Sequence, residues 1–234
     1  MSLFPSLFED GEALVIDKPA GLPLDTPRAG GISLDDHLEH LRLGFQRAPM
    51  PVHRLDRDTS GCLLLARNPK AHKRFTAAFE ARSVEKRYLG IVAGLLDAEE
   101  GTIDLALSKI SSAAEGWRMI PAKAGKPSVT HWRKLMVADG NTLVEFRPET
   151  GRTHQIRIHA LAGLGLPLLG DPVYGDGAGA KRTMLHAAAL TVHRGDKPSI
   201  VAVSPMPADF AALGFSDPVV ADPGNPAAAD PGNG

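Results

Sequence analysis

The chain has 234 residues, of which 43% are hydrophobic and 23% are charged, so most of it is expected to be globular. No apolar run approaches the roughly 20 residues that a membrane-spanning helix needs, and the N-terminal residues lack the pattern of a signal peptide. The single cysteine, Cys62, excludes an intrachain disulfide and favours a reducing environment. These features predict a cytoplasmic protein without a membrane anchor.

The net charge is only −1, but the charged residues are unevenly distributed. Residues 42–90 carry eleven basic and four acidic side chains, and residues 109–157 carry nine basic and four acidic ones, which gives +7 and +5. Residues 1–41, with two basic and eight acidic side chains, give −6. Two basic blocks on an acidic background fit a surface that binds a polyanion. Ordinary solvated surfaces explain charge alone equally well.

The first half of the chain has two continuous apolar runs that predict buried strands, over 13–17 and 62–66. Two helices are predicted by side chains that can cap them, one over 34–43 with Ser33 as cap and one over 69–82 with Asn68 as cap.

The second half of the chain has more predicted strands than helices. Strands are predicted over 86–92, 128–136, 142–147, 185–192 and 199–203, and helices over 153–162 and 207–213. The turn 139–141 predicts a hairpin. This irregular order favours an α+β fold, with a mixed, largely antiparallel sheet and flanking helices. Residues 1–215 are predicted to form one domain, and the Pro/Gly/Ala-rich residues 216–234 a disordered tail.

One carboxylate, Asp56, stands between two arginines directly before a predicted buried strand. Arg54 and Arg57 should keep this carboxylate ionised, and an ionised carboxylate can act as a nucleophile or stabilise positive charge. A single aspartate in a loop is, however, more often a turn former or a helix cap.

A second segment, 152–159, contains two Arg, two His, a Gln and a Thr within eight residues. If the helix starts at Thr153, His154 and Arg157 share one face, and the helix N-terminus can bind phosphate. A surface helix with scattered polar groups is the alternative. His154 and His159 are five residues apart, which is not the spacing of a helical metal site, so no metal is expected.

Tyr88 is one of only two tyrosines and is flanked by Lys86 and Arg87. A strand aromatic that packs on the core is the more common explanation of such a residue.

Together these segments resemble motifs of the RluA family of pseudouridine synthases, and specifically its short members without an S4-type RNA-binding domain. The resemblance spans about residues 13–210. The matching segments, in the family's order, are 17–21, 53–61, 86–88, 151–159, 168–175 and 185–187.

The resemblance implies the pseudouridine synthase fold with a central basic cleft, and an enzyme that isomerises uridines in structured RNA without a cofactor or metal. Asp56 would be the catalytic carboxylate and Arg157 its partner. Tyr88 would stack on the flipped base and could remove its C5 proton, and Leu185 would pack against the base. The residues expected to bind substrate RNA are Lys18, His53, Arg54, Arg57, Thr59, Arg152, Thr153, His154, Gln155 and Leu185.

The glycosidic carbon of a stacked uridine is hidden, so the nucleotide must be extruded at a cost of roughly a few kcal/mol. Arg54 is expected to fill the gap, because a guanidinium plane can replace lost stacking. The side chains of Asp56, Tyr88 and Arg157 are therefore expected to converge in one basic cleft.

Two other functions stay open at this point, an inactive RNA-binding module and a hydrolase with Asp56 as nucleophile. The hydrolase would need a metal or a second paired carboxylate, and Asp58 is too near in sequence. The predicted substrates are stem-loops of 23S ribosomal RNA, transfer RNA or both, modified by a monomer.

Overall fold

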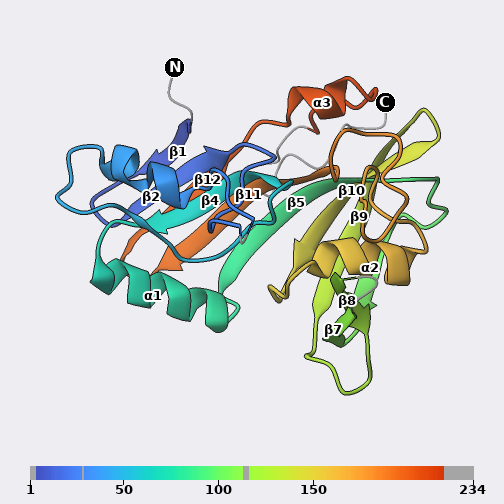
Figure 1. The fold of residues 1–234 in the computed structure, drawn as a ribbon, viewed down its shortest axis with the longest axis horizontal. Helices are drawn as coiled ribbons and strands as arrows, with labels where there is room; N and C mark the ends of the chain where they lie inside the picture. Colours follow the sequence, from blue (N-terminus) through green and yellow to red (C-terminus); the bar gives the residue numbers. More distant parts are fainter. Residues whose placement is uncertain (1–3, 28, 113–115, 219–234) are drawn as a thin grey trace, which may run out of the picture.

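The computed structural model describes residues 4–27, 29–112 and 116–218, and within them one large sheet has helices on both faces (Figure 1). The strand order is β1-β2-β4-β11-β5-β10-β9-β6, with β12 beside β11 and β3 beside β4, while β7 and β8 form a separate hairpin. The strands are β1 (Ser6–Glu9), β2 (Ala13–Lys18), β3 (Met50–Pro51), β4 (Ser60–Ala66), β5 (Val84–Val92), β6 (Glu100–Asp104), β7 (Leu107–Ser112), β8 (Gly116–Pro121), β9 (Val129–Ala138), β10 (Asn141–Pro148), β11 (Leu185–Arg194) and β12 (Lys197–Val203). The helices are η1 (Asp35–Arg42), α1 (Pro69–Glu80), α2 (Gln155–Leu164) and α3 (Ala208–Ala211).

The α+β architecture agrees with the sequence prediction, because all pairs in the large sheet are antiparallel except β11 with β4. In β2 and β4, alternate side chains enter different cores, which explains why both strands are continuous apolar runs. One core includes Ala71 and Phe75 of α1, and the other includes Leu34 and Leu41 around η1. The helices thus cover opposite faces of this half of the sheet.

Two helix predictions need correction. Residues 35–42 form a 3-10 helix, in which the Ser33 hydroxyl donates to Asp36 instead of capping the first turn of an α-helix. The helix predicted from Thr153 begins at Gln155, because His154 adopts a left-handed backbone with φ 53°. The Asn68 cap of α1 is confirmed, since its side chain accepts a hydrogen bond from the backbone of Ala71 at 2.9 Å.

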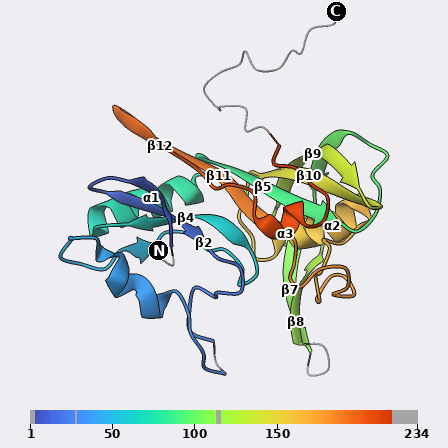
Figure 2. The ribbon, with the colours of Figure 1, turned by 90° about the horizontal axis from the view of Figure 1, so that it is seen from above.

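Gly61 allows the close contact between β4 and β11, the one parallel pair in the large sheet. Its φ of +106° is in the region that favours glycine, and a Cβ there would lie 2.2 Å from the carbonyl oxygen of Ala187. This contact draws the loop before β4 toward the start of β11. The two halves of the large sheet meet here, with α1 against one half and α2 against the other (Figure 1, Figure 2).

Ser216 and Asp217 belong to the predicted disordered tail, but both contact the fold. The Asp217 carboxylate accepts a hydrogen bond from the backbone of Met206 at 3.2 Å, and the Ser216 hydroxyl lies 3.7 Å from the sulfur of Met136. The rest of the predicted tail, from 219 onward, lies outside the described residues. No helix in the described part of the chain is long and apolar enough to cross a membrane.

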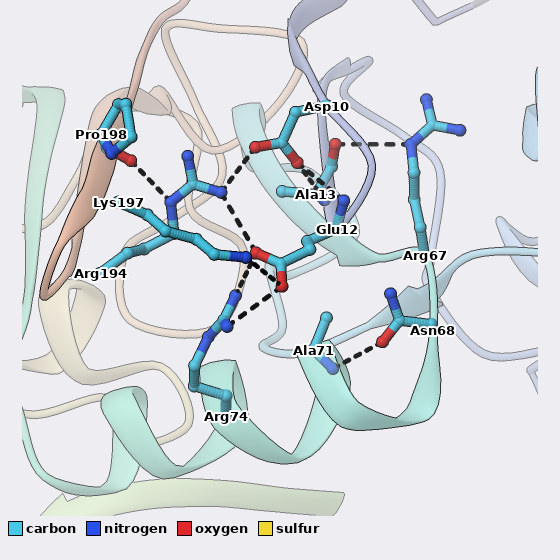
Figure 3. A network of polar contacts seen from close by, with 10 residues as sticks. All are labelled: Asp10, Glu12, Ala13, Arg67, Asn68, Ala71, Arg74, Arg194, Lys197 and Pro198. Atoms are coloured by element: carbon cyan, nitrogen blue, oxygen red, sulfur yellow. Dashed lines mark hydrogen bonds and ion pairs between the residues drawn. The ribbon is translucent and has the colours of Figure 1, made fainter.

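A cluster of charged side chains joins three segments that are far apart in the sequence (Figure 3). These are the turn between β1 and β2, helix α1, and the hairpin of β11 and β12. Glu12, in the turn between β1 and β2, accepts hydrogen bonds from Arg74 of α1 at 2.6 Å and from Lys197 of β12 at 3.0 Å. Arg194 donates to the neighbouring Asp10 at 2.6 Å. The hydrogen bonds from Arg74 and Lys197 lower the pKa of Glu12 to about 2.

Replacing Glu12 by Gln should lower the free energy of unfolding at pH 7 by about 1–2 kcal/mol, since water screens a partly exposed cluster. Because the folded-state pKa is depressed, this stabilisation is present above pH 4.5, the ordinary value, and is lost as the pH falls toward 2. Urea unfolding of both proteins between pH 3 and 7 measures the difference. The control is Glu99→Gln, because Glu99 pairs with Lys134 but is 74% exposed. A difference for Glu12 that does not shrink at low pH would contradict this account.

Candidate active site

Asp56 lies in the loop between β3 and β4, at the edge of a cleft of about 390 Å³. The backbone N–H of Thr59 donates to the carbonyl of Asp56 at 3.1 Å, which closes a tight turn and fixes the carboxylate beside β4. Tyr88 of β5 and Arg157 of α2 line the same cleft, together with Leu185 at the start of β11. Four segments far apart in the sequence therefore converge here.

The Asp56 carboxylate has two cationic or polar neighbours at longer than hydrogen-bond distance. Its Oδ2 is 3.6 Å from Nη1 of Arg157 and 3.8 Å from Nε2 of His154, and the side chain is 20% exposed. Among the described residues no side chain donates a hydrogen bond to either carboxylate oxygen. Both oxygens are thus available to a bound molecule.

Arg157 is fixed by a buried carboxylate rather than by Asp56. Its Nε and Nη2 each donate to Asp171 at 2.7 Å, a bidentate pair that leaves Nη1 directed toward Asp56. Asp171 is fully buried and also accepts hydrogen bonds from the backbone of Val173 and Tyr174. Although burial opposes it, hydrogen bonding from Arg157 holds the pKa of Asp171 below its usual range.

His154 is oriented by a chain of hydrogen bonds that starts in β8. The backbone N–H of Met119 donates to the Tyr174 hydroxyl at 2.9 Å, and this oxygen lies 3.0 Å from Nδ1 of His154. Burial lowers the pKa of His154 to about 4, so its ring is neutral at pH 7. If Nδ1 accepts the tyrosine proton, Nε2 carries the hydrogen and presents it to the carboxylate of Asp56, which can only accept.

Tyr88 stands at the junction of two hydrophobic cores, one beside η1 and one beside α2. Burial, with the nearby charge of Asp56, raises the pKa of its phenol well above the usual value, so the free protein holds it protonated. Side chains alternate along β5. Lys86 therefore shares the cleft face with Tyr88, whereas Arg87 pairs with Glu145.

The cleft is basic, as predicted, because five cationic side chains and two carboxylates line it. Lys86 has no carboxylate partner among the described residues, and its ammonium donates only to the backbone carbonyls of Thr150, at 3.3 Å, and Glu149, at 3.5 Å. Burial and the neighbouring Arg82 lower the pKa of Lys86 to about 8. The cations are Arg54, Arg82, Lys86, Arg152 and Arg157, and the carboxylates are Asp56 and Glu80.

Most of the predicted RNA-binding residues line this cleft, but Lys18 and Arg57 do not. Lys18 is fully buried, and its ammonium donates to the carbonyls of Pro19, Leu22 and Arg57, so it positions the loops around Asp56 and cannot reach RNA. Arg57 is exposed outside this cleft and pairs with Asp58 at 2.9 Å. The predicted RNA-binding residues that do line this cleft are His53, Arg54, Thr59, Arg152, Thr153, His154, Gln155 and Leu185.

Gln155 lines the cleft, yet its side-chain amide is fully used within the protein. Its oxygen accepts from the Thr150 hydroxyl and the backbone of Arg152, and its nitrogen donates to Val129 and Thr130. The predicted hydrogen bond to RNA does not fit this arrangement, because no donor or acceptor of the amide is left over.

Sequence reasoning missed the supporting residues Asp171, Tyr174 and Arg182. Arg182 donates to the carbonyls of Asp58 at 2.9 Å and Leu185 at 3.1 Å, and so ties the loop of Asp56 to the start of β11. Asp171 and Tyr174 lie in the segment 168–175, whose resemblance to a family motif was their one signal in the sequence. Nothing local in the sequence marks Arg182.

The chain is similar to known RNA-modifying enzymes. A family model described as RNA pseudouridylate synthase matches residues 12–162. An uncharacterized RNA pseudouridine synthase of Zymomonas mobilis is 54% identical over 211 residues, which cover 89% of this chain and 96% of that protein. The ribosomal large subunit pseudouridine synthase D of Pseudomonas aeruginosa is 41% identical over 72% of this chain, which spans about half, 52%, of that relative.

Solved structures show the same fold. The human RNA pseudouridylate synthase domain containing 1 superposes with a TM-score of 0.73 at 29% identity, over 88% of this chain and 85% of that one. The human RNA pseudouridylate synthase domain containing 4 has the same TM-score at 24% identity, over 88% and 90%, which supports the fold alone.

Proposed function

The chain belongs to the RNA pseudouridylate synthase family, and on this premise we propose that Asp56 is the catalytic carboxylate with which it converts uridine in RNA to pseudouridine. The observation that carries the assignment is the convergence of Asp56, Tyr88 and Arg157 in one basic cleft. A carboxylate with free oxygens, beside a fixed guanidinium, suits a reaction in which positive charge develops on ribose.

The reaction is an isomerisation and balances without a further reactant. The bond between ribose C1′ and uracil N1 breaks, the ring turns, and C1′ joins C5. The proton on C5 leaves, and N1 gains one. Asp56 would act at the sugar, by attack on it or by proton abstraction, while the glycosidic bond breaks. Nη1 of Arg157 and Nε2 of His154 approach the same oxygen of Asp56 and would hold the carboxylate in its orientation.

Tyr88 and Leu185 belong to the apolar lining of the cleft, against which the flipped uracil would lie. The raised pKa of Tyr88 favours stacking by its ring over removal of the C5 proton by its hydroxyl. Tyr88→Phe should therefore keep RNA affinity within about threefold of the original protein and lose less than tenfold in kcat. A hydroxyl that serves as the base would instead cost roughly 10²–10⁴-fold in kcat. Single-turnover rates on substrate RNA distinguish these outcomes.

Lys86, with Arg82 and Arg152 nearby on the cleft lining, would bind an RNA phosphate. Because the pKa of Lys86 in the free protein is about 8, RNA affinity should fall as the pH rises from 7 to 9, by up to about tenfold per pH unit above 8. Binding titrations at constant ionic strength measure the effect. Lys86→Arg, which stays charged, should flatten the profile, and an unchanged profile in this variant would exclude Lys86.

The substrate is proposed to be a stem-loop of 23S ribosomal RNA, transfer RNA or both. We propose that the protein modifies it in the cytoplasm as a monomer. The support is the similarity to relatives named for the ribosomal large subunit. Arg54 would fill the gap left by the extruded uridine, and Arg57, Thr59 and Arg152 would contact the surrounding RNA. Mapping pseudouridines in total RNA from a strain that lacks the gene tests this. Loss of a site in either RNA class supports the proposal, and no lost site contradicts it.

Family membership does not favour the two alternative functions. An inactive RNA-binding module would not need the carboxylate of Asp56. A hydrolase with two carboxylates would need a second carboxylate paired with Asp56 across the substrate.

A further inference from the structure

A second cavity, of about 310 Å³, adjoins the first one at Asp56. The two cavities share Asp56, Arg54 and His154, among other residues. Trp117 of β8 lines only the second one. We propose that this cavity binds the nucleobase next to the target uridine, with Trp117 as its stacking surface. This inference rests on the proposed function, since it needs RNA at Asp56.

Trp117 is 43% exposed, which is unusual for the largest apolar side chain, and yet it is fixed in place. Its ring stacks on His154 with a centroid distance of 4.8 Å and an interplanar angle of 29°. His154 in turn lies 3.8 Å from Asp56, so the indole is one ring away from the catalytic carboxylate. An exposed, oriented aromatic ring beside an RNA site is the usual platform for an unpaired base.

The hairpin of β7 and β8 presents this ring on one particular face. Trp117 pairs with Ser111, and Met119 pairs with Lys109, so these four share a face of the hairpin. The side chain of Met119 on that face is buried, and the backbone N–H of Met119 donates a hydrogen bond to the Tyr174 hydroxyl. Both contacts anchor the hairpin to the site. Figure 1 shows the hairpin projecting from the sheet beside α2.

The composition of the second cavity favours a base over a phosphate. Pro23, Leu24, Pro172 and Val173 supply apolar walls. Charged groups of both signs line the rest, with Arg54 and Arg157 offset by carboxylates such as Asp25. A phosphate would gain little there, whereas a flat, neutral base with polar edges matches apolar walls and mixed donors and acceptors. Lys109, whose ammonium is 4.7 Å from the Trp117 ring centre, has the flexible stem to move aside toward the backbone of the same nucleotide.

The test uses the full-length protein and a synthetic stem-loop. This stem-loop carries the uridine that stays unmodified in the deletion strain. Trp117→Ala should weaken RNA binding roughly 5- to 150-fold, the range of one base–aromatic stack, while Trp117→Phe should recover most of the affinity. The control is Ile110→Ala. Ile110 is 37% exposed on the opposite face of the same hairpin, and this variant should bind RNA like the original protein.

Stem-loops with an abasic nucleotide on the 5′ or the 3′ side of the uridine distinguish stacking from mere support of His154. Stacking predicts that one of the two abasic RNAs binds more weakly to the original protein, and that Trp117→Ala causes no further loss with it. A loss that is the same with all RNAs would overturn the inference and leave only a structural role.

Fluorescence gives an independent readout, because the chain has two tryptophans and the other, Trp132, is buried. In a Trp132→Phe variant, the intact stem-loop should quench the emission of Trp117, and the sensitive abasic stem-loop should not. Equal emission changes with both would contradict stacking. If the original protein forms no pseudouridine at all, the proposed function fails; if it does, and Trp117→Ala binds normally, only this inference fails.

Discussion

Asp56→Asn should abolish pseudouridine formation, with a loss of at least about 10⁴-fold, the upper end of what one positioned proton-transfer group provides. The substitution keeps the shape of the side chain and removes its charge. Its contacts at 3.6 and 3.8 Å are too long to be hydrogen bonds, and Arg157 keeps its pair with Asp171. The melting temperature should therefore stay within a few degrees of the original.

The RNA affinity of Asp56→Asn should equal or exceed that of the original protein, because the substitution removes a negative charge from a site that binds a polyanion. Activity, melting temperature and RNA binding, measured on the same preparation, test the three statements together. Asp97→Asn, at an exposed position, is the control for an aspartate substitution. Retained activity would remove Asp56 from the mechanism, whereas lost binding would assign it to RNA recognition.

Asp171→Asn should have the largest effect on stability. It leaves the guanidinium of Arg157 buried without its bidentate partner, and breaking a buried ion pair costs about 3–5 kcal/mol of unfolding free energy. The freed Arg157 should also turn away from the geometry that places Nη1 near Asp56. Activity should then fall at least about tenfold even at low temperature, where the protein is still folded.

Asp171 is a positioning residue, so its variant should lose kcat while folded protein still binds RNA. Chemical unfolding gives the stability, and single-turnover kinetics at saturating RNA gives the rate. The matched control is Asp176→Asn in the same loop, because Asp176 makes an exposed hydrogen bond to the backbone of Ala178 at 2.8 Å. A variant at Asp171 with the original stability would show that the ion pair does not hold the site together.

Local sequence patterns predicted most readily the strands that are largely buried on both faces, which are β2, β4, β10 and β11. The runs in β2 and β4, the cap of α1 and the hairpin of β9 and β10 are each specified within about ten residues. The strands that the patterns missed, β1, β3, β6, β7 and β8, are short or partly exposed, and their pairing depends on partners elsewhere in the fold.

The same reasoning explains what could be predicted of the site. Asp56, Tyr88 and Arg157 stand in dense motifs, and the structure brings them to one cleft. Lys18 belongs to such a motif too, but burial, which no local pattern reveals, turns its ammonium toward backbone carbonyls. Trp117 has no motif at all, and its place beside His154 follows only from how the hairpin packs on α2.

The most direct test of the central claim is to incubate the purified protein with RNA from the deletion strain, labelled with tritium at C5 of uridine. Isomerisation through Asp56 predicts that released tritium equals the pseudouridine formed, that no free uracil appears, and that Asp56→Asn releases no tritium. Free uracil in the mixture, or tritium release by Asp56→Asn, would contradict the account.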